Sequence, residues 1–507
     1  MADDEIIVKK SLAYSKGLLR PTIVITLFTI SAQAVGFLTQ IIIAQAFGAR
    51  ADMDAFLAAN TLPQYIISVL LGTLGVVFIP IFIDYIPNNK ENEAWEVATS
   101  VINISALILM AFAFIGIIFA DPLLRFTTPG LSSHSLHLAT QVAMITWPTI
   151  IATGITNLLT GIYQAKHRFS WPAAIPLIGS ILNLLLILIL IRRLGIIGLA
   201  IASTASIVLQ GILLSPIIIG KNHYHFRIQW HHPGVHQVFH LLWPLVVSGV
   251  LVRWTPIIDR YLASELSVGS IAHLGYATKL LAIFGMLIST GIATVIFPKM
   301  ALNRAENDLE AFRETISKGL RTMWMIVAPV IFIGGVLALP LVTVLFQRGA
   351  FTVDDSLKVA GLLQIYIFSL AGSCIGSITG RAFYALKYVK IISFIGVIEA
   401  IVYAVYTPIL TWYFGVSGIA LGYVLYFTIG IVWHLPLIRK KAGNRGGRTV
   451  ILSFCRILIA ASVACVIAIL GMKISQNNLI QLIVVTVIGM TSYIVILKIL
   501  KSPELKC

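Results

Sequence analysis

The stretch IPLIGSILNLLLILILI (175–191) has no charged residue, and only Ser180 and Asn183 carry polar side chains. The stretch 452–472 is similar, with one arginine, Arg456. About 20 consecutive apolar residues form a helix that crosses the ~30 Å hydrocarbon core of a bilayer. The whole chain of 507 residues is 58% hydrophobic and 11% charged, whereas soluble domains are about half apolar and a quarter charged. These stretches therefore indicate an integral membrane protein.

Apolar segments of this kind recur along the chain between polar, proline and glycine breaks. Backbone groups in lipid must be hydrogen-bonded within their own segment, so each one is expected to be a helix. The predicted fold is an all-α polytopic membrane protein with about fourteen transmembrane helices, at 21–47, 58–84, 98–120, 136–164, 171–191, 195–219, 238–262, 269–297, 316–346, 359–385, 391–412, 416–438, 451–472 and 479–499.

The distribution of Lys and Arg predicts the orientation of these helices. With the N-terminus in the cytoplasm, 25 of the 36 basic residues fall on the cytoplasmic side, 7 outside and 4 within spans. This excess on the inside is the pattern of inner-membrane proteins, and it places both termini in the cytoplasm. We therefore attribute the net charge of +16 to topology and to attraction toward anionic membrane lipids, not to nucleic acid.

An internal repeat is visible when the second half of the chain is aligned on the first with Ala385 at the position of Ala165. In this alignment the string LGIIGLA (194–200) matches FGVSGIA (414–420), and Pro216 matches Pro436. The shift spans six helices, an even number that preserves orientation, which predicts a parallel repeat of two six-helix lobes with two additional C-terminal helices.

The predicted organisation follows from this repeat. It consists of a cytoplasmic tail (1–20), an N-lobe (21–219), a cytoplasmic linker (220–237), a C-lobe (238–438) and a C-terminal pair of helices with its tail (439–507).

Motifs of nucleotide binding and covalent catalysis are absent from the sequence. There is no GxxxxGK[ST], no HExxH, no GxSxG and no Cys/His cluster with metal-ligand spacing. We expect no enzyme activity, no cofactor and no resident metal. Without an ATP site, the energy for transport is expected from the membrane potential, from an ion gradient such as that of Na⁺, or from the downhill fate of the substrate.

Charged residues inside the predicted spans are the main candidates for function, because each costs ~2.5–3.5 kcal/mol at the centre of a helix. Arg253 and Arg260 are seven residues apart, which predicts one shared helix face, and Lys279 lies in the next span. These three cations are expected to line an anion-binding cavity. The alternative is that an arginine extends its side chain to the membrane interface, which suits Arg260 better than Arg253.

Two acidic residues, Asp259 and Glu399, also lie within predicted spans. They either pair with the cations or bind a coupling cation. A third acid, Asp54, belongs to the turn FGARADMDAF (47–56), where the simplest interpretation is a capping cluster outside the membrane.

Several strings in this sequence resemble the MurJ/MviN lipid II flippase family of the MOP exporter superfamily. They extend over essentially the whole chain in the family's order: AFGARADMDAFLAANTLP (46–63), FIPIF (78–82), IDRYLAS (258–264), GSIAHLGYATKL (269–280), IATVIFPKMA (292–301), VLFQRGAFT (344–352) and RAFYAL (381–386). The resemblance implies two lobes around a cationic cavity that binds the diphosphate of an undecaprenyl-linked precursor.

The resemblance also assigns roles to individual positions. Asp54 matches the acid of the DAF motif, Lys279 stands where the family has arginine, and Asp259 matches an acid that belongs to a sodium site in some members. The first-helix arginines of the family are replaced by Gln33 and Thr39. The basic residues expected after the second-helix LPN are absent from LPQYIISVLL (62–71).

These features together predict a flippase, expected to act as a monomer, for an undecaprenyl-diphosphate-linked saccharide, with lipid II of peptidoglycan as the first choice. Two alternatives are a flippase for an exopolysaccharide or O-antigen lipid-linked oligosaccharide, and a MATE-like cation-coupled exporter. A MATE-like exporter would need a cavity centred on carboxylates. A polymerase that consumes the same lipid is a third alternative, but it would need a catalytic carboxylate in a long external loop, and every predicted external loop is short.

Overall fold

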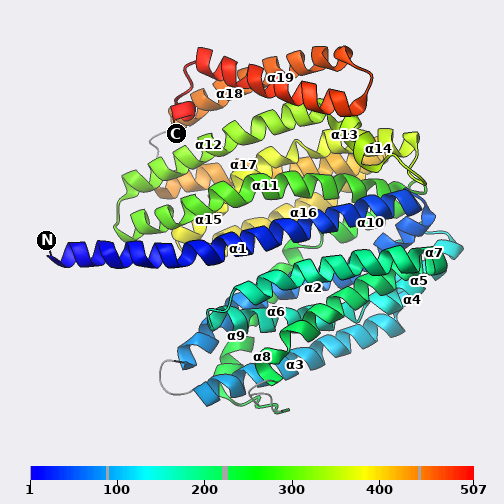
Figure 1. The fold of residues 1–507 in the computed structure, drawn as a ribbon, viewed down its shortest axis with the longest axis vertical. Helices are drawn as coiled ribbons and strands as arrows, with labels where there is room; N and C mark the ends of the chain where they lie inside the picture. Colours follow the sequence, from blue (N-terminus) through cyan, green and yellow to red (C-terminus); the bar gives the residue numbers. More distant parts are fainter. Residues whose placement is uncertain (1, 87–90, 220–225, 443–446, 507) are drawn as a thin grey trace. The chain divides into compact units, whose positions relative to one another are not determined.

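The computed structural model describes residues 2–86, 91–219, 226–442 and 447–506, and its regular structure over these ranges is helical (Figure 1). Twelve segments of the described chain are long and apolar enough to cross a membrane. One of them, Ser170–Ile219, contains the non-helical residue Gly195 and so covers two predicted spans. A further helix, Ser270–Ala305, lies at the predicted span 269–297. The prediction of an all-α polytopic protein with about fourteen spans is confirmed.

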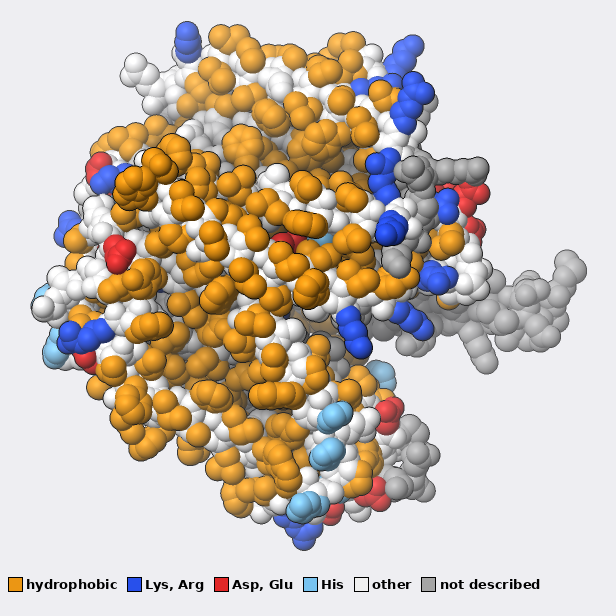
Figure 2. Space-filling model, turned by 180° about the vertical axis from the view of Figure 1, so that it is seen from behind, with side chains coloured by type: hydrophobic (Ala, Val, Ile, Leu, Met, Phe, Trp, Pro, Cys, Tyr) orange, Lys and Arg blue, Asp and Glu red, His pale blue; other side chains and the backbone are white. Residues whose placement is uncertain are grey.

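The surface of these helices carries large apolar side chains. Phe114 is 64% exposed and Trp412 is 80% exposed, and Figure 2 shows hydrophobic side chains over most of the face in view. A soluble protein rarely exposes a continuous apolar area of this extent. The lipid chains of a bilayer provide the environment that such a surface requires.

The chain divides into two compact units, each described separately below. Unit 1 comprises Met1–Phe47 and Ala51–Ile257, and unit 2 comprises Gly48–Arg50 and Ile258–Cys507. The helices of unit 1 are α1 (Ala2–Phe47), α2 (Ala51–Tyr85), α3 (Glu91–Ile118), α4 (Ala120–Thr127), α5 (Ser133–Thr146), α6 (Thr149–Ala165), α7 (Ser170–Leu214), α8 (Pro216–Ile219) and α9 (Pro233–Val252).

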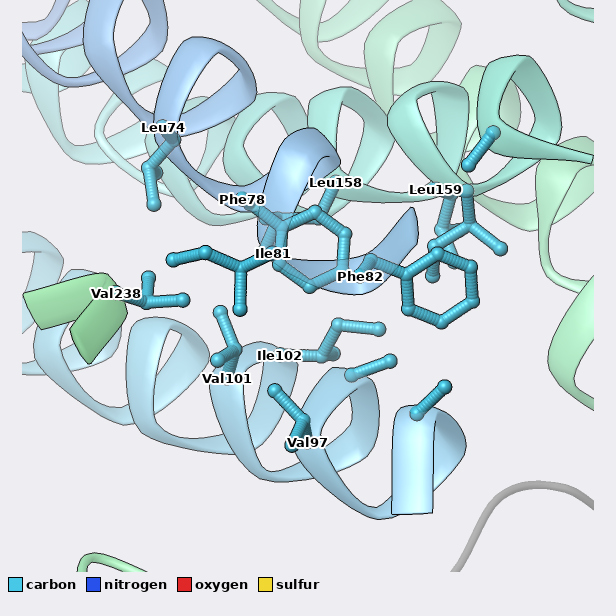
Figure 3. Close-up of a cluster of buried hydrophobic side chains, with 14 of the residues drawn as sticks. Leu74, Phe78, Ile81, Phe82, Val97, Val101, Ile102, Leu158, Leu159 and Val238 are labelled. Atoms are coloured by element: carbon cyan, nitrogen blue, oxygen red, sulfur yellow. The ribbon is translucent and has the colours of Figure 1, made fainter. Parts of the chain in front are cut away.

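The main hydrophobic cluster of unit 1 joins α2, α3, α6 and α9. Phe78 and Phe82 of α2 are fully buried in it, and the ring of Phe82 meets that of Trp95 edge-on at 5.7 Å between centroids. Figure 3 shows the rings of Phe78 and Phe82 among aliphatic side chains from α3 and α6, with Val238 of α9 at the edge of the cluster. This packing attaches α9 to unit 1.

Unit 2 consists of the remaining helices, except that the first residues of α10 fall in unit 1. They are α10 (Thr255–Ser264), α11 (Ser270–Ala305), α12 (Leu309–Val336), α13 (Ala338–Phe346), α14 (Val353–Tyr366), α15 (Ser369–Ala385), α16 (Val389–Phe414), α17 (Val416–Ala442), α18 (Gly447–Gly471) and α19 (Asn478–Ile499), with short 3₁₀ turns at Met472–Ile474 and Pro503–Lys506. The C-terminal pair, α18 and α19, packs beside α12 (Figure 1).

The predicted repeat appears in the helix boundaries. In the alignment of Ala165 with Ala385, α5 and α14 begin and end at equivalent positions, and so do α6 and α15. The N-cap residues Ser132 and Thr352 are also equivalent, and each accepts a hydrogen bond from the backbone N–H three residues later. The repeat inferred from sequence is therefore confirmed in local structure.

Two glycines of the repeat adopt the same unusual backbone conformation. Gly195 has φ 54° and ψ −131°, and Gly415 has φ 57° and ψ −137°. Three residues after each lies a second glycine with no room for a side chain: a Cβ at Gly198 would lie 2.7 Å from the carbonyl oxygen of Leu190. At Gly418 the corresponding distance to the oxygen of Leu410 is 2.1 Å. The GxxG pattern thus forms a sharp reversal with closely packed backbones in both units.

The division into units differs from the predicted lobes at one place. The sequence placed the boundary in the linker 220–237, whose residues 220–225 lie outside the described part, and assigned 238–262 to the C-lobe. In the structure α9 belongs to unit 1, because it packs against α2 and the Tyr65 hydroxyl donates to the carbonyl oxygen of Val250 at 2.7 Å. The predicted tail 1–20 continues the helix of α1 from Ala2 onward.

A buried carboxylate fixes the C-terminal turn of unit 2. The Glu504 side chain is 2% exposed and accepts hydrogen bonds from the hydroxyls of Ser453 at 2.6 Å and Ser502 at 2.5 Å. The Arg321 guanidinium lies 3.2 Å away. Burial alone would raise the pKa of Glu504, but the two hydroxyl hydrogen bonds and the charge of Arg321 hold the pKa below its ordinary value of 4.5.

Replacing either reversal glycine should destabilise the protein. We expect Gly195→Ala and Gly415→Ala each to lower the free energy of unfolding by about 1–3 kcal/mol, because a side chain is strained at this φ and ψ. Gly361→Ala, at a helical position with open space around it, is the control and should unfold at the same or a higher temperature. Thermal unfolding of purified protein in detergent measures the difference, and equal midpoints for all three variants would contradict the assignment.

Glu504→Gln should lower the free energy of unfolding at neutral pH by about 1.5–3 kcal/mol, the typical contribution of hydrogen bonds to a charged group. A carboxyl whose pKa is lowered in the folded state stabilises the protein above its ordinary pKa and loses this contribution as the pH falls through the folded value. The difference between wild type and variant should therefore shrink on acidification below about pH 4.5. Glu265→Gln, at an exposed carboxylate, should show no difference at either pH.

Candidate functional site

The first-helix candidates Gln33 and Thr39 lie in different environments on α1. Gln33 is exposed, whereas Thr39 is 2% exposed and donates its hydroxyl to the carbonyl oxygen of Val35 at 2.9 Å. Of these two positions, Gln33 is thus the one with a side chain open to a ligand.

Asp54 lies in the first turn of α2, together with Asp52. Negative charge is stabilised there by the unpaired N–H groups and the dipole of the helix. The Asp54 side chain is 4% exposed, so this candidate is a buried residue of a helix N-terminus. Arg50, in the preceding turn, is exposed.

Arg253 follows the last residue of α9. Its backbone N–H bonds to the carbonyl oxygen of Gly249 at 3.1 Å, and its guanidinium donates to the carbonyl oxygen of Ser68 on α2. This arginine therefore closes the end of α9 and links it to α2 within unit 1.

The prediction that Arg253 and Arg260 share a helix face is wrong. The helix is interrupted at Arg253 and Trp254, and Arg260 lies on α10 in unit 2. Pro256 explains the interruption, because proline has no N–H to donate to the carbonyl four residues earlier, at the end of α9, and its ring would collide with that carbonyl in a continuous helix. Pro256 was the sequence signal for this break.

Asp259 of α10 is hydrogen-bonded to a tyrosine of α16. The hydroxyl of Tyr403, a fully buried residue, donates to Asp259 Oδ1. Hydrogen bonds to an ionised acceptor are stronger than neutral ones, and in a low-dielectric environment they stabilise a carboxylate that would otherwise be costly.

Arg260, the residue after Asp259 on α10, lies near both this carboxylate and Lys279 of α11. Arg260 donates to the carbonyl oxygen of Ile271 at 3.0 Å and acts electrostatically on both Asp259 and Lys279. The Lys279 ammonium lies 6.0 Å from the centroid of the Tyr276 ring, at the outer limit of a cation–π contact. Within unit 2, Arg260 is thus a neighbour of both Asp259 and Lys279.

A group of tyrosines around Asp259 was missed by the sequence reasoning. Edge-to-face ring contacts join Tyr403 to Tyr406 and Tyr426 at 5.7 Å each, and Tyr366 to Tyr423 at 5.4 Å. The signal was present in the spacing, since Tyr403 and Tyr406 are three residues apart, as are Tyr423 and Tyr426. Tyrosine combines an apolar ring with a hydroxyl that needs a partner when buried.

Glu399, the other acidic candidate, lies on α16, one helical turn before Tyr403. Its carboxylate is 3.9 Å from His434 Nε2 of α17. The structure does not pair Glu399 with any of the predicted cations: within the described ranges the one basic side chain within 4 Å of its carboxylate is this histidine. The same ranges contain no cluster of three or more His, Cys, Asp and Glu side chains able to hold a metal ion.

The repeat connects candidates from both units. In the alignment of Ala165 with Ala385, Gln33 corresponds to Arg253 and Thr39 corresponds to Asp259. The positions where the family resemblance expects arginines are therefore polar or charged in both repeats.

Three of the strings quoted for the resemblance meet in unit 2. The Tyr276 hydroxyl donates to the carbonyl oxygen of Gly48 at 3.1 Å, and its ring packs on Phe346 and Phe351 at 5.4 and 5.3 Å. A Cβ at Gly48 would lie 2.3 Å from the carbonyl oxygen of Ala350, and one at Gly269 would lie 2.4 Å from that of Ala49. Glycine is required at both places, and these motif residues are structural.

A family model of the lipid II flippase MurJ matches residues 43–489. This protein belongs to the MurJ family. Among curated MurJ-family relatives it is 26% identical to the probable lipid II flippase MurJ of Buchnera aphidicola subsp. Acyrthosiphon pisum over 411 residues, 80% of either chain. It is 25% identical to that of Thermotoga maritima over 507 residues, 98% of either chain.

Solved structures agree with the MurJ-family fold. A lipid II flippase MurJ in an inward closed conformation matches with a TM-score of 0.83 at 23% identity, over 94% of this chain and 98% of the other. An inward-facing MATE multidrug transporter of the MOP superfamily matches with a TM-score of 0.70 at 16% identity, over 82% and 94%. At these identities the likeness concerns the fold.

Tyr403→Phe tests the support of Asp259 in this MurJ-family protein. Removing the hydroxyl leaves a carboxylate without its donor, which should lower the free energy of unfolding by about 1–3 kcal/mol. Tyr413→Phe, on the same helix at a side chain 68% exposed, should leave the thermal midpoint unchanged. If the hydrogen bond carries the effect, Asp259→Asn combined with Tyr403→Phe should cost less than the sum of the single changes. Strict additivity would contradict this interpretation.

Proposed function

We propose that this protein translocates lipid II, the undecaprenyl-diphosphate-linked precursor of peptidoglycan, across the bacterial inner membrane. The observation that carries the proposal is the match of the family model over residues 43–489. Curated relatives of near-equal length are named lipid II flippases, including that of Burkholderia cenocepacia, 24% identical over 386 residues and 74% of either chain.

The cationic residues of unit 2 are suited to the diphosphate of this cargo. Arg260 and Lys279 lie close enough to repel each other electrostatically, and an anion between them would relieve that repulsion. Attraction to phosphate is strong where water is excluded and the local dielectric is low. We assign the diphosphate to these two side chains.

A second cargo is supported by one specific observation. Gln33 and Thr39 stand where the family resemblance places arginines, so this chain has fewer cations in its first helix. A polyprenyl-diphosphate linked to a different cell-envelope saccharide would present the same diphosphate with another sugar. Cargo competition assays distinguish the two.

The proposed transporter works without nucleotide and as a monomer. The sequence contains no nucleotide-binding motif, so the driving force is an ion gradient, such as that of Na⁺, or the membrane potential. The excess of Lys and Arg on one side supports cytoplasmic termini.

Lys279→Ala should abolish or sharply reduce flipping while the protein still inserts and folds. A charge-assisted contact contributes ~1.5–3 kcal/mol, or roughly ten- to hundredfold in cargo affinity. Lys279→Arg should retain activity because the charge is kept. Lys299→Ala, at an exposed lysine of the same helix, is the matched control.

The measurement is lipid II flipping per folded molecule in vesicles without ATP, combined with rescue of cells depleted of their lipid II flippase. Normal flipping by well-folded Lys279→Ala would remove this residue from the site. Strict ATP dependence of the purified protein, or failure to rescue, would contradict the proposed function.

A further inference from the structure

A buried pair of titratable side chains, Glu399 of α16 and His434 of α17, lies within unit 2. Their side chains are 10% and 12% exposed, and Glu399 Oε1 lies 3.9 Å from His434 Nε2. This distance exceeds that of a hydrogen bond, which is about 2.7–3.2 Å. The two groups face each other without being bonded.

The Glu399 carboxylate has no other partner in the described part of the chain. Its Oε1 atom is buried and accepts no hydrogen bond, and no Lys or Arg there lies within ion-pair distance of it. A buried polar atom without a partner typically costs about 1–3 kcal/mol, and more if it is charged. Such a group in a native structure calls for a functional explanation.

The orientation of His434 follows from its second ring nitrogen. His434 Nδ1 lies 3.2 Å from the hydroxyl oxygen of Thr379 on α15, and that hydroxyl donates to the carbonyl oxygen of Gly376, also at 3.2 Å. A hydroxyl has one proton to donate, and with that proton directed at Gly376 we assign the Nδ1 proton of His434 as the donor to Thr379. The lone pair of a neutral His434 is then on Nε2, directed at the Glu399 carboxylate.

Two acceptors therefore face each other across a gap that one proton would close. The ring of Phe383 packs edge-on against the His434 ring, with 5.7 Å between centroids. If the pair gains a proton, the carboxyl group becomes a neutral acid that donates to Nε2, which avoids two separated charges in a buried site.

A glycine on the neighbouring helix makes room for the Glu399 side chain, and the first repeat has an equivalent space that holds a neutral side chain. A Cβ at Gly430 of α17 would lie 3.1 Å from Glu399 Oε1, so glycine makes room for the carboxylate. At the equivalent place in unit 1 the roles are exchanged: Gly179 makes room for the amide of Gln210, which would lie 2.4 Å from a Cβ there. Each repeat places one long polar side chain between the same two helical segments, and only that of unit 2 is ionisable.

Other titratable groups around the pair are tyrosines. Tyr406 of α16 and Tyr426 of α17 act electrostatically with Glu399, and Tyr406 also with Asp259. The Tyr406 hydroxyl is committed to the carbonyl oxygen of Gly422 at 2.9 Å. The third helix at the pair, α15, contributes Thr379 and Phe383 to it, and carries Arg381, which forms no ion pair with Glu399.

We propose that Glu399 and His434 form a proton-binding site that is loaded and emptied during the transport cycle. One proton from the aqueous phase binds between the carboxylate and Nε2, raises the charge of the pair by one, and leaves again as a proton. The proposal rests on the proposed function for its role in transport, but the site itself does not.

The donor set favours a proton over a metal cation. Hard cations such as Na⁺ or Mg²⁺ take several oxygen ligands. Here the carboxylate faces a nitrogen, Tyr406 is committed to Gly422, and Tyr403 is committed to Asp259. A proton needs only the two facing acceptors.

Infrared spectroscopy of the full-length protein in lipid vesicles tests the site without requiring transport. As the pH is lowered, the C=O band of a buried carboxylic acid should appear, be absent in Glu399→Gln, and shift its midpoint by about 1 pH unit or more in His434→Gln. Glu306→Gln, at an exposed carboxylate, should match wild type. Glutamine is expected to be tolerated at 399, because unit 1 holds an amide in the equivalent space.

The proposal is overturned if the band is missing in wild type at every pH, or if it persists unchanged in Glu399→Gln. It is also overturned if replacing choline by Na⁺ in the buffer at fixed pH removes the band, since a metal cation would then be bound to the carboxylate in place of the proton.

Lipid II flipping in the same vesicles completes the test. The wild-type rate should depend on pH by up to about tenfold per unit, the limit for one proton, and this dependence should vanish in Glu399→Gln. An unchanged pH profile in Glu399→Gln would separate the proton site from transport and overturn its role there. A titrating band without any flipping would instead refute the proposed function and leave the proton site standing.

Discussion

Every backbone N–H and C=O inside the hydrocarbon must find a partner within the protein, and the architecture follows from this requirement. Helices satisfy it locally, so the chain is helical, and each break needs a specific device. At Gly195 and Gly415 the device is a glycine conformation followed by a close backbone approach at Gly198 and Gly418. At Arg253 the device is a side chain: the helix stops before Pro256, and the arginine closes its end and reaches a carbonyl of α2.

The same cost of unsatisfied polar groups organises the interior of unit 2. The Asp259 carboxylate is stabilised by a hydrogen bond from the Tyr403 hydroxyl. The Glu504 carboxylate is stabilised by hydrogen bonds from two serines and by the charge of Arg321. Glu399 differs from both, because its neighbour His434 presents a lone pair in place of a donor. Carboxylates with firm donors contribute to stability, and the carboxylate that lacks one is the one suited to exchanging a proton.

The two repeats share backbone features but differ in their polar side chains. Helix ends, N-caps and reversal glycines coincide when Ala165 is aligned with Ala385. The polar side chains do not follow this symmetry: Gln33 and Thr39 in one repeat correspond to Arg253 and Asp259 in the other, and the Gly179–Gln210 pair corresponds to Glu399 and Gly430. The ionisable residues of these pairs, Arg253, Asp259 and Glu399, thus all belong to the second repeat, and their counterparts in the first repeat are neutral.

The sequence by itself determined the membrane class, the helix count, the repeat and the intramembrane charges, because hydropathy, charge bias and glycine spacing are local properties of the chain. It placed Lys279, Arg260 and Asp259 in adjacent spans, and in the structure Arg260 lies near each of the other two. It was wrong about the shared face of Arg253 and Arg260, although Pro256 carried the signal. Only the tertiary structure assigned α9 to unit 1 and placed Tyr403 on Asp259 and His434 opposite Glu399. These contacts join residues up to 185 positions apart, and they depend on how helices pack against each other, which the apolar pattern of a membrane helix does not encode because lipid and protein interior are equally apolar.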